Sequence, residues 1–246
     1  MDASDQSRDC APLAALLYDS GSLPGIADIV GAAQAAGRFS VTHVAPASDG
    51  WAELLRDGLT FDLSGLSGGA RAGSPEVIHL LGVEPHMIEG CAALLLSPGP
   101  HLAGAEKLLP VIRVIAELVL QLSRVGEPKA ICWIPAKNAL SPALFAKAVS
   151  PWLDGGPFPA LALAAIQRTS DGSVESEGLK FLTGQEFSLS SQSASSPEQL
   201  TRAAIRLIDW LVAHGPVTKA QKVNLAGTGA VFLEAQGSTR IVARCV

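Results

Sequence analysis

The sequence predicts an α+β fold: a mixed sheet with packed helices, two βαβ-like units and an antiparallel hairpin. Segments 11–45 and 91–135 each combine two short apolar runs with a longer segment of helical periodicity, which gives the two βαβ-like units. The dipeptide Asp171-Gly172 lies between two apolar runs and is typical of a tight antiparallel turn. A purely parallel, doubly wound sheet would lack such a hairpin.

In the first part of the chain, apolar runs and glycine positions place the elements. A helix over 24–36 has Ile26, Ile29, Val30 and Ala33 on one face, and Gly37 is expected to end it. A second, short helix is expected over 51–56. The expected strands are 11–18, 39–45, 59–63 and 77–83, with a glycine-rich loop over 64–75.

The central part contains the expected core helix, 110–125, between strands 91–97 and 130–134. Its polar residues recur along one narrow stripe, so most of its surface must be covered by other elements. A helix that Ser141 caps and Pro142 begins follows, up to Gly155-Gly156-Pro157.

The last part begins with a hairpin of strands 160–167 and 174–182. The serine-rich segment 188–196 is expected to be a solvated connector. Ser196, Pro197 and Gln199 then predict a helix start with a capping box, and Gly215-Pro216 its end. Strands near 222–225, 230–234 and 240–245 complete the fold.

Length and composition favour one α+β domain over 1–246, with a subdivision into 1–89 and 90–246 as the alternative. The formal charge is −5, and the basic residues are scattered without a stripe, which argues against nucleic acid as a partner. Charged residues interrupt the most apolar segment, 108–122, so no membrane span is expected.

The four cysteines form no C-x-x-C pair, and we expect them to be reduced thiols in the cytoplasm. The polar, acidic residues 1–5 do not resemble a signal peptide.

Candidate ligand-binding residues come from the rule that ligands bind beyond the carboxyl ends of parallel strands. If strands 91–97 and 129–135 are parallel neighbours, Ser97, His101, Lys137 and Asn138 share one edge of the sheet. A hydroxyl, an imidazole, an ammonium and an amide there could hold a small polar ligand. The alternative is that Lys137 and Asn138 only solvate a turn.

Three other motifs are weaker. Gly65-Leu66-Ser67-Gly68-Gly69 has the letters of the nucleophile elbow G-x-S-x-G, but the residues after it open a helix poorly. His79, Glu84, His86 and Glu89 crowd together without the spacing of a standard metal site, so no metal is expected. Segment 97–104 has glycines where a phosphate loop would need them, but two prolines remove amide donors.

A family resemblance rests on Cys132-Trp133-Ile134, on 181–187 (FLTGQEF) and on the late helix before Gly215-Pro216-Val217. Together these resemble the bacterial family called domain of unknown function 4261, over about residues 90–236. The spacing of Gly184 and Phe187 departs from that family's pattern. The resemblance implies an α+β domain and brings no established activity or catalytic residues.

The sequence therefore predicts a cytoplasmic binding or interaction module of bacterial type, without cofactor or identifiable catalytic residues. Its partner would be a small molecule or a protein. A serine hydrolase that uses Ser67 is the main alternative, and self-association through terminal strands is another.

Overall fold

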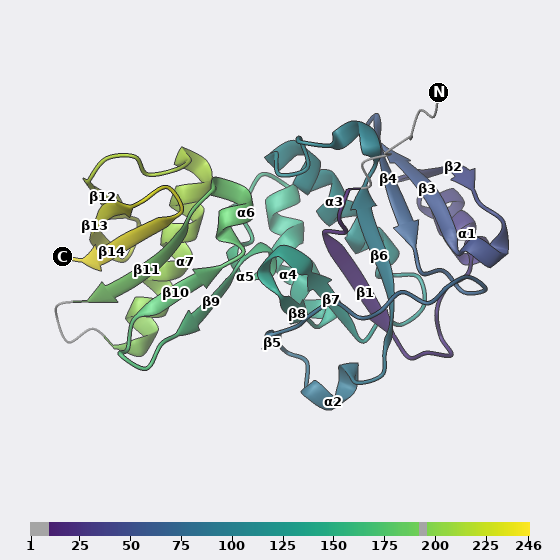
Figure 1. Cartoon of the computed structure of the whole chain (residues 1–246), viewed down its shortest axis with the longest axis horizontal. Coiled ribbons are helices and arrows are strands. Elements are labelled where there is room, and N and C mark those ends of the chain that lie inside the picture. The colour runs from purple at the N-terminus through teal and green to yellow at the C-terminus, as the bar shows by residue number, and fades with distance from the viewer. Residues whose placement is uncertain (1–9, 192–195) are drawn as a thin grey trace, which may run out of the picture. The chain divides into compact units, whose positions relative to one another are not determined.

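The structure is a computed structural model that describes residues 10–191 and 196–246 (Figure 1). The chain forms two compact units, here called unit 1 (up to 134, and 139–147) and unit 2 (135–138 and 148–246). Both units combine helices with a sheet, which confirms the α+β class. Segments on both sides of position 90 contribute strands to the same sheet in unit 1.

The sheet of unit 1 has the strand order β2-β3-β4-β6-β1-β7-β8-β5 in the described residues. Its strands are β1 (Ala14–Tyr18), β2 (Ser40–Val44), β3 (Trp51–Arg56), β4 (Leu59–Ser64), β5 (His79–Leu81), β6 (Ala92–Pro98), β7 (Ala130–Trp133) and β8 (Asn138–Leu140). Strand β1 pairs antiparallel with both β6 and β7. These two strands therefore run parallel, as predicted, but β1 lies between them.

Two helices of unit 1, α1 (Ile26–Ala36) and α3 (Leu109–Leu122), contact the sheet and each other. Most of α3 is buried, and Gly37 ends α1 with a left-handed φ of 59°, as the sequence predicts. A second cluster of unit 1 consists mostly of small side chains of the sheet, against which residues of segment 77–91 pack, including Ile88 of α2 (Pro85–Ile88). Those small residues include Ala15, Ala93, Ala130 and Cys132.

The sheet of unit 2 has the order β12-β13-β14-β11-β10-β9. Its strands are β9 (Ala165–Arg168), β10 (Val174–Glu177), β11 (Glu186–Ser191), β12 (Gln221–Leu225), β13 (Gly229–Gln236) and β14 (Arg240–Cys245). The helices are α4 (Pro142–Leu153), which begins in unit 1, α5 (Ala160–Leu163), α6 (Leu179–Thr183) and α7 (Pro197–His214). Strand β14 pairs parallel with β11 and antiparallel with β13.

Helix α7 carries the hydrophobic face of unit 2. Its residues at helical spacing, Leu200, Ala203, Ala204, Leu207, Ile208 and Leu211, are buried in one cluster with the sheet. The predicted capping box is present: the Ser196 hydroxyl accepts the Gln199 N–H, and Gln199 Oε1 accepts the Ser196 N–H at 2.8 Å. The sequence therefore predicts both the start and the buried face of this helix correctly.

A buried amide fastens the chain that follows α7. Gln185 is 3% exposed, and its Nε2 donates to the Val217 carbonyl at 3.0 Å. Its Oε1 accepts the Val217 N–H at 2.7 Å. Both backbone groups of a buried residue are thus satisfied by one side chain.

The expected helix over 51–56 is wrong, because these residues form β3. Ala52 and Leu54 are buried while their neighbours are partly exposed, which is the alternation of a strand. Asp57 and Gly58, both with positive φ, make the tight turn into β4.

Three further expectations need correction. Segment 160–167 begins as α5 and only then becomes β9. Segment 174–182 leaves the sheet after Glu177 and ends in α6, although the β9–β10 hairpin is confirmed. Ser188 to Ser191 belong to β11, which lies inside the sheet, so this part of the serine-rich segment is no connector. Residues 192–195 lie outside the described residues.

Candidate functional site

Ser97 and His101 lie at the carboxyl end of β6 in unit 1. Ser97 is the cross-strand partner of Asp62 on β4. His101 follows in a short 3-10 turn, where its Nδ1 lies 3.2 Å from Thr60 Oγ1. The turn is held by the Gly99 N–H, which donates to the Thr60 carbonyl at 2.9 Å. These two predicted residues are therefore near each other.

Lys137 and Asn138 belong to unit 2 and have local structural contacts. Lys137 takes a left-handed φ of 48°, and its Nζ lies 3.7 Å from Glu177 Oε1. Asn138 is fully buried, and its amide donates to the carbonyls of Leu161 at 3.3 Å and Ala162 at 3.2 Å. A side chain at 0% exposure that binds two carbonyls of α5 does not solvate a turn.

Sequence reasoning missed a polar row that crosses four strands of unit 1. His43, Glu53, Asp62 and Ser97 are successive cross-strand partners on β2, β3, β4 and β6, and therefore share one face of the sheet. Glu53 accepts a hydrogen bond from Thr42 Oγ1 at 2.6 Å. The sequence feature that could have revealed this row is the alternation of side chains in 51–56, a segment that the sequence analysis assigns to a helix. Across the described residues, no group of three or more His, Cys, Asp or Glu side chains could hold a metal ion.

The G-x-S-x-G segment forms a loop after β4. A small pocket of about 100 Å³ beside it is lined by Ser20, Gly21, Leu23, Leu66, Ser67, Gly68, Gly69 and Arg71. A serine hydrolase needs a base within hydrogen-bond reach of its nucleophile. The described residues that line this pocket include neither a histidine nor a carboxylate.

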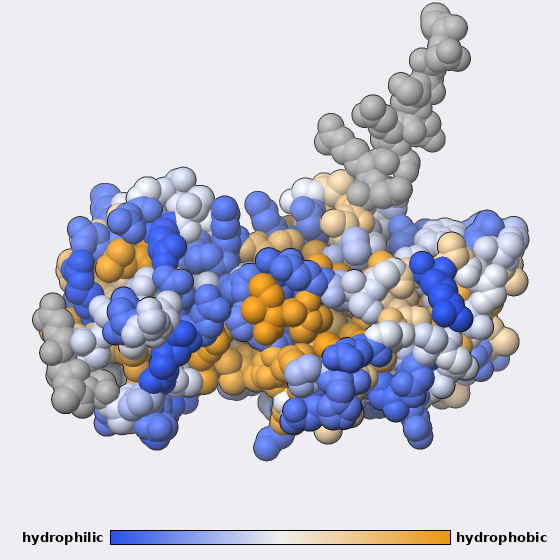
Figure 2. Space-filling view, turned by 60° about the horizontal axis from the view of Figure 1, so that its bottom comes forward, coloured by the Kyte–Doolittle hydropathy of each residue, from blue (hydrophilic) through white to orange (hydrophobic). Residues whose placement is uncertain are grey.

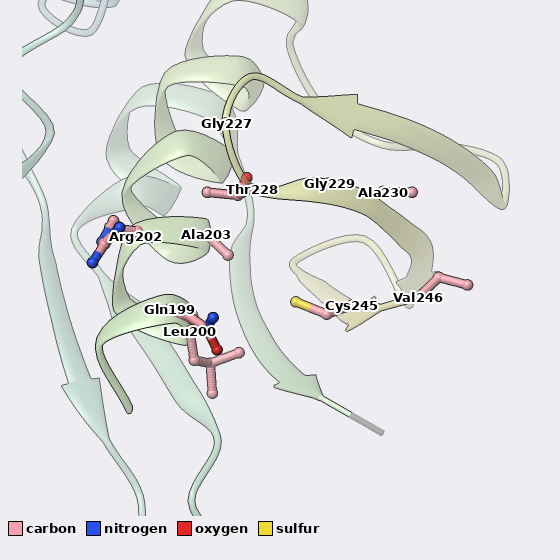
Figure 3. A pocket seen from close by; sticks show the side chains of 10 residues that line it. All are labelled: Gln199, Leu200, Arg202, Ala203, Gly227, Thr228, Gly229, Ala230, Cys245 and Val246. Carbon is pink, nitrogen blue, oxygen red and sulfur yellow. The ribbon is translucent and has the colours of Figure 1, made fainter. Parts of the chain in front are cut away.

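A larger cavity, of about 520 Å³, lies in unit 2 between the first turns of α7 and the β12–β13 turn (Figure 3). Its described lining is Gln199, Leu200, Arg202, Ala203, Gly227, Thr228, Gly229, Ala230, Cys245 and Val246. In Figure 3 the Cys245 thiol points toward α7, and the Arg202 side chain extends away from the β13 side of the cavity.

The polar groups of this cavity are mostly neutral. Gln199 Oε1 is engaged by the Ser196 N–H at 2.8 Å, so its amide nitrogen remains as a donor. Thr228 Oγ1 donates to the Leu225 carbonyl at 3.4 Å and remains an acceptor. Burial raises the pKa of the Cys245 thiol, which keeps it protonated at neutral pH. None of the described lining residues is acidic.

Apolar surface is also present (Figure 2). The large apolar side chains that are exposed in the described residues are Val44, Ile78, Met87, Leu108, Leu144 and Val246. They come from separate elements, and single exposed apolar residues are normal in proteins. No helix in the described part of the chain is long and apolar enough to cross a membrane.

Comparison of the chain with protein-family models, with curated proteins and with solved structures gives no match. The resemblance to domain of unknown function 4261 therefore stays a prediction. Segment 181–187, one of those on which the resemblance rests, stabilises this fold: Gly184 ends α6 with a φ of 85°, and the Gln185 side chain binds Val217.

Proposed function

We propose that this protein is a non-catalytic binding module that holds a small molecule in the cavity of unit 2. The observation that supports this is the cavity itself, because its 520 Å³ lies within the range of about 300–1,000 Å³ typical of ligand pockets. Leu200 and Ala203 supply apolar surface, while Gln199 and Thr228 supply one donor and one acceptor.

The lining favours an uncharged, polar ligand with several hydrogen-bonding groups, because most of the cavity surface is polar. A carboxylate or phosphate would need a cation inside the cavity to offset its desolvation. The only cation among the described lining residues is Arg202, and its side chain extends away from the β13 side (Figure 3). We also propose a cytoplasmic location, which is supported by four free cysteines in the described residues.

The test is a thermal-shift screen of the whole protein against a library of neutral metabolites. A compound that binds only the folded state raises the melting temperature by mass action. Thr228→Trp should fill part of the cavity and abolish the shift, because the Thr228 side chain points toward α7 (Figure 3). Ala226→Trp, in the adjacent turn and outside the lining, is the matched control and should keep it.

A second readout uses the thiol. A bound compound should slow iodoacetamide labelling of Cys245, measured by peptide mass spectrometry, because this side chain lines the cavity. Failure of every compound to shift the melting temperature would count against the proposal. So would a hit that Thr228→Trp leaves unchanged.

A further inference from the structure

The loop between β4 and β5 builds a second, smaller pocket in unit 1, and its chemistry differs from that of the unit 2 cavity. Its polar side chains are Ser20, Ser67 and Arg71, and glycines form much of the remaining wall. The pocket, of about 100 Å³, has about a fifth of the volume of the unit 2 cavity, so it fits a small group better than a large ligand.

The loop is held in one conformation by backbone contacts. A Cβ added to Gly69 would lie 2.3 Å from Gly50 Cα, so the two chain segments touch through their backbones. The Leu66 N–H donates to the Gly50 carbonyl at 3.0 Å, and the Leu66 side chain is buried. The Ser67 N–H donates to the Pro24 carbonyl at 2.9 Å. The wall around Ser67 is therefore preorganised before any ligand arrives.

Beyond Arg71, the loop is fastened to β6. Ala72 forms an isolated bridge with Ala93, and a Cβ on Gly65 would lie 2.3 Å from the Ala93 carbonyl oxygen. Both ends of the pocket segment are thus fixed to the same strand. The Arg71 side chain therefore extends from a backbone that is held in place.

The hydrogen-bond donors and acceptors of the pocket determine which ligand it would accept. Within the described residues, neither the Arg71 guanidinium nor the Ser67 hydroxyl has a hydrogen-bond or ion-pair partner. Asp19 pairs with Lys129 at 3.0 Å, while Asp28 accepts the Gly25 N–H at 2.8 Å through one carboxylate oxygen and keeps its negative charge. The N–H groups of Ser67 and Gly69 already donate to the carbonyls of Pro24 and Leu66, so the side chains must supply the donors. A guanidinium and a hydroxyl suit an oxoanion.

We propose that this pocket, here called the Ser67 pocket, binds a tetrahedral phosphate group. Arg71 would donate paired N–H bonds to two phosphate oxygens, and Ser67 would donate its O–H to a third. The group could come from inorganic phosphate or from the end of a phosphate monoester whose remainder lies in solvent. Ser67 then serves as a binding hydroxyl, and the serine needs no base.

The probe is inorganic phosphate, titrated into the full chain by isothermal calorimetry at constant ionic strength. One site should be seen in the wild type and in Arg38→Gln, which removes another exposed arginine of unit 1 that lies outside the pocket. Arg71→Gln should weaken binding by about tenfold or more, and Ser67→Ala by a smaller factor. Arg71→Lys should recover part of the loss.

Glycerol phosphate separates the two sources. Binding at least as tight as that of inorganic phosphate supports an open site for monoesters, and weaker binding supports the free anion as the ligand. The proposal is overturned if phosphate does not bind, or if Arg71→Gln and Arg38→Gln bind it as well as the wild type does. Melting temperatures of all variants, measured without phosphate, show whether each chain is folded.

Discussion

Replacing Gln185 tests whether one buried amide holds the chain after α7. The substitution Gln185→Met keeps most of the side-chain volume and removes both hydrogen bonds to Val217, which are 3.0 and 2.7 Å long. Val217 is 1% exposed, so its N–H and carbonyl would lose their partner without gaining water. Each buried polar group left unsatisfied costs about 1–3 kcal/mol, so the expected loss for two is about 2–6 kcal/mol.

Such a loss is a large part of the 5–15 kcal/mol that typically stabilises a domain. The assay is urea unfolding followed by hydrogen exchange of α7 peptides, because this readout reports on unit 2 even if the two units unfold separately. Gln236→Met, at the exposed end of β13, is the control and should stay within about 0.5 kcal/mol of the wild type. An equally small effect for Gln185→Met would refute the reasoning.

Three further predictions concern single side chains. Gly69→Ala should lower the melting temperature, because its new Cβ would lie 2.3 Å from backbone atoms, whereas Gly73→Ala meets no atom within 4 Å and should be neutral; equal melting temperatures would contradict this. Hydrogen bonds from Thr169 and Ser173 lower the pKa of Asp171 from 3.8 to about 2. Its ionised form therefore stabilises the fold above pH 4, and this contribution disappears as the pH falls through 2, so urea midpoints of Asp171→Asn and wild type should converge at low pH. Burial raises the pKa of Cys132 to about 12, so iodoacetamide at pH 8 should label Cys245 in the folded protein before Cys132, as peptide mass spectrometry would show.

The elements that sequence reasoning predicted correctly are those with signals at both ends. Helix α7 has a capping box, a continuous apolar face and a terminal glycine, so local and tertiary preferences agree. Segment 51–56 was misassigned because its residues, WAELLR, include good helix formers. Pairing with β2 and β4 overrides that preference, and the Asp57-Gly58 turn was the overlooked indication.

The candidate site was harder to predict, because it depended on strand order. Ser97 and His101 do lie close together, since only a short turn separates them. Lys137 and Asn138 were placed beside them on the assumption that β6 and β7 are adjacent, but β1 lies between these strands. In the sequence, an asparagine that binds a ligand looks the same as one that binds the carbonyls of α5, as Asn138 does. Cavities formed by distant segments, such as the one in Figure 3, leave no local pattern.

The interior position of β1 and β14 has a consequence for synthesis of the chain. Ala14 must wait for Leu96 and Trp133 before both sides of its strand are paired, so the centre of this sheet forms from contacts far apart in sequence. In unit 2 the central strand is the last to be synthesised. Strand β14 pairs with both β11 and β13, so these two strands are joined only when residues 240–245 have left the ribosome. A nascent chain stalled before position 240 would expose one unpaired edge on β11 and one on β13 to chaperones and to other nascent chains, although β10 and β12 still pair with these strands.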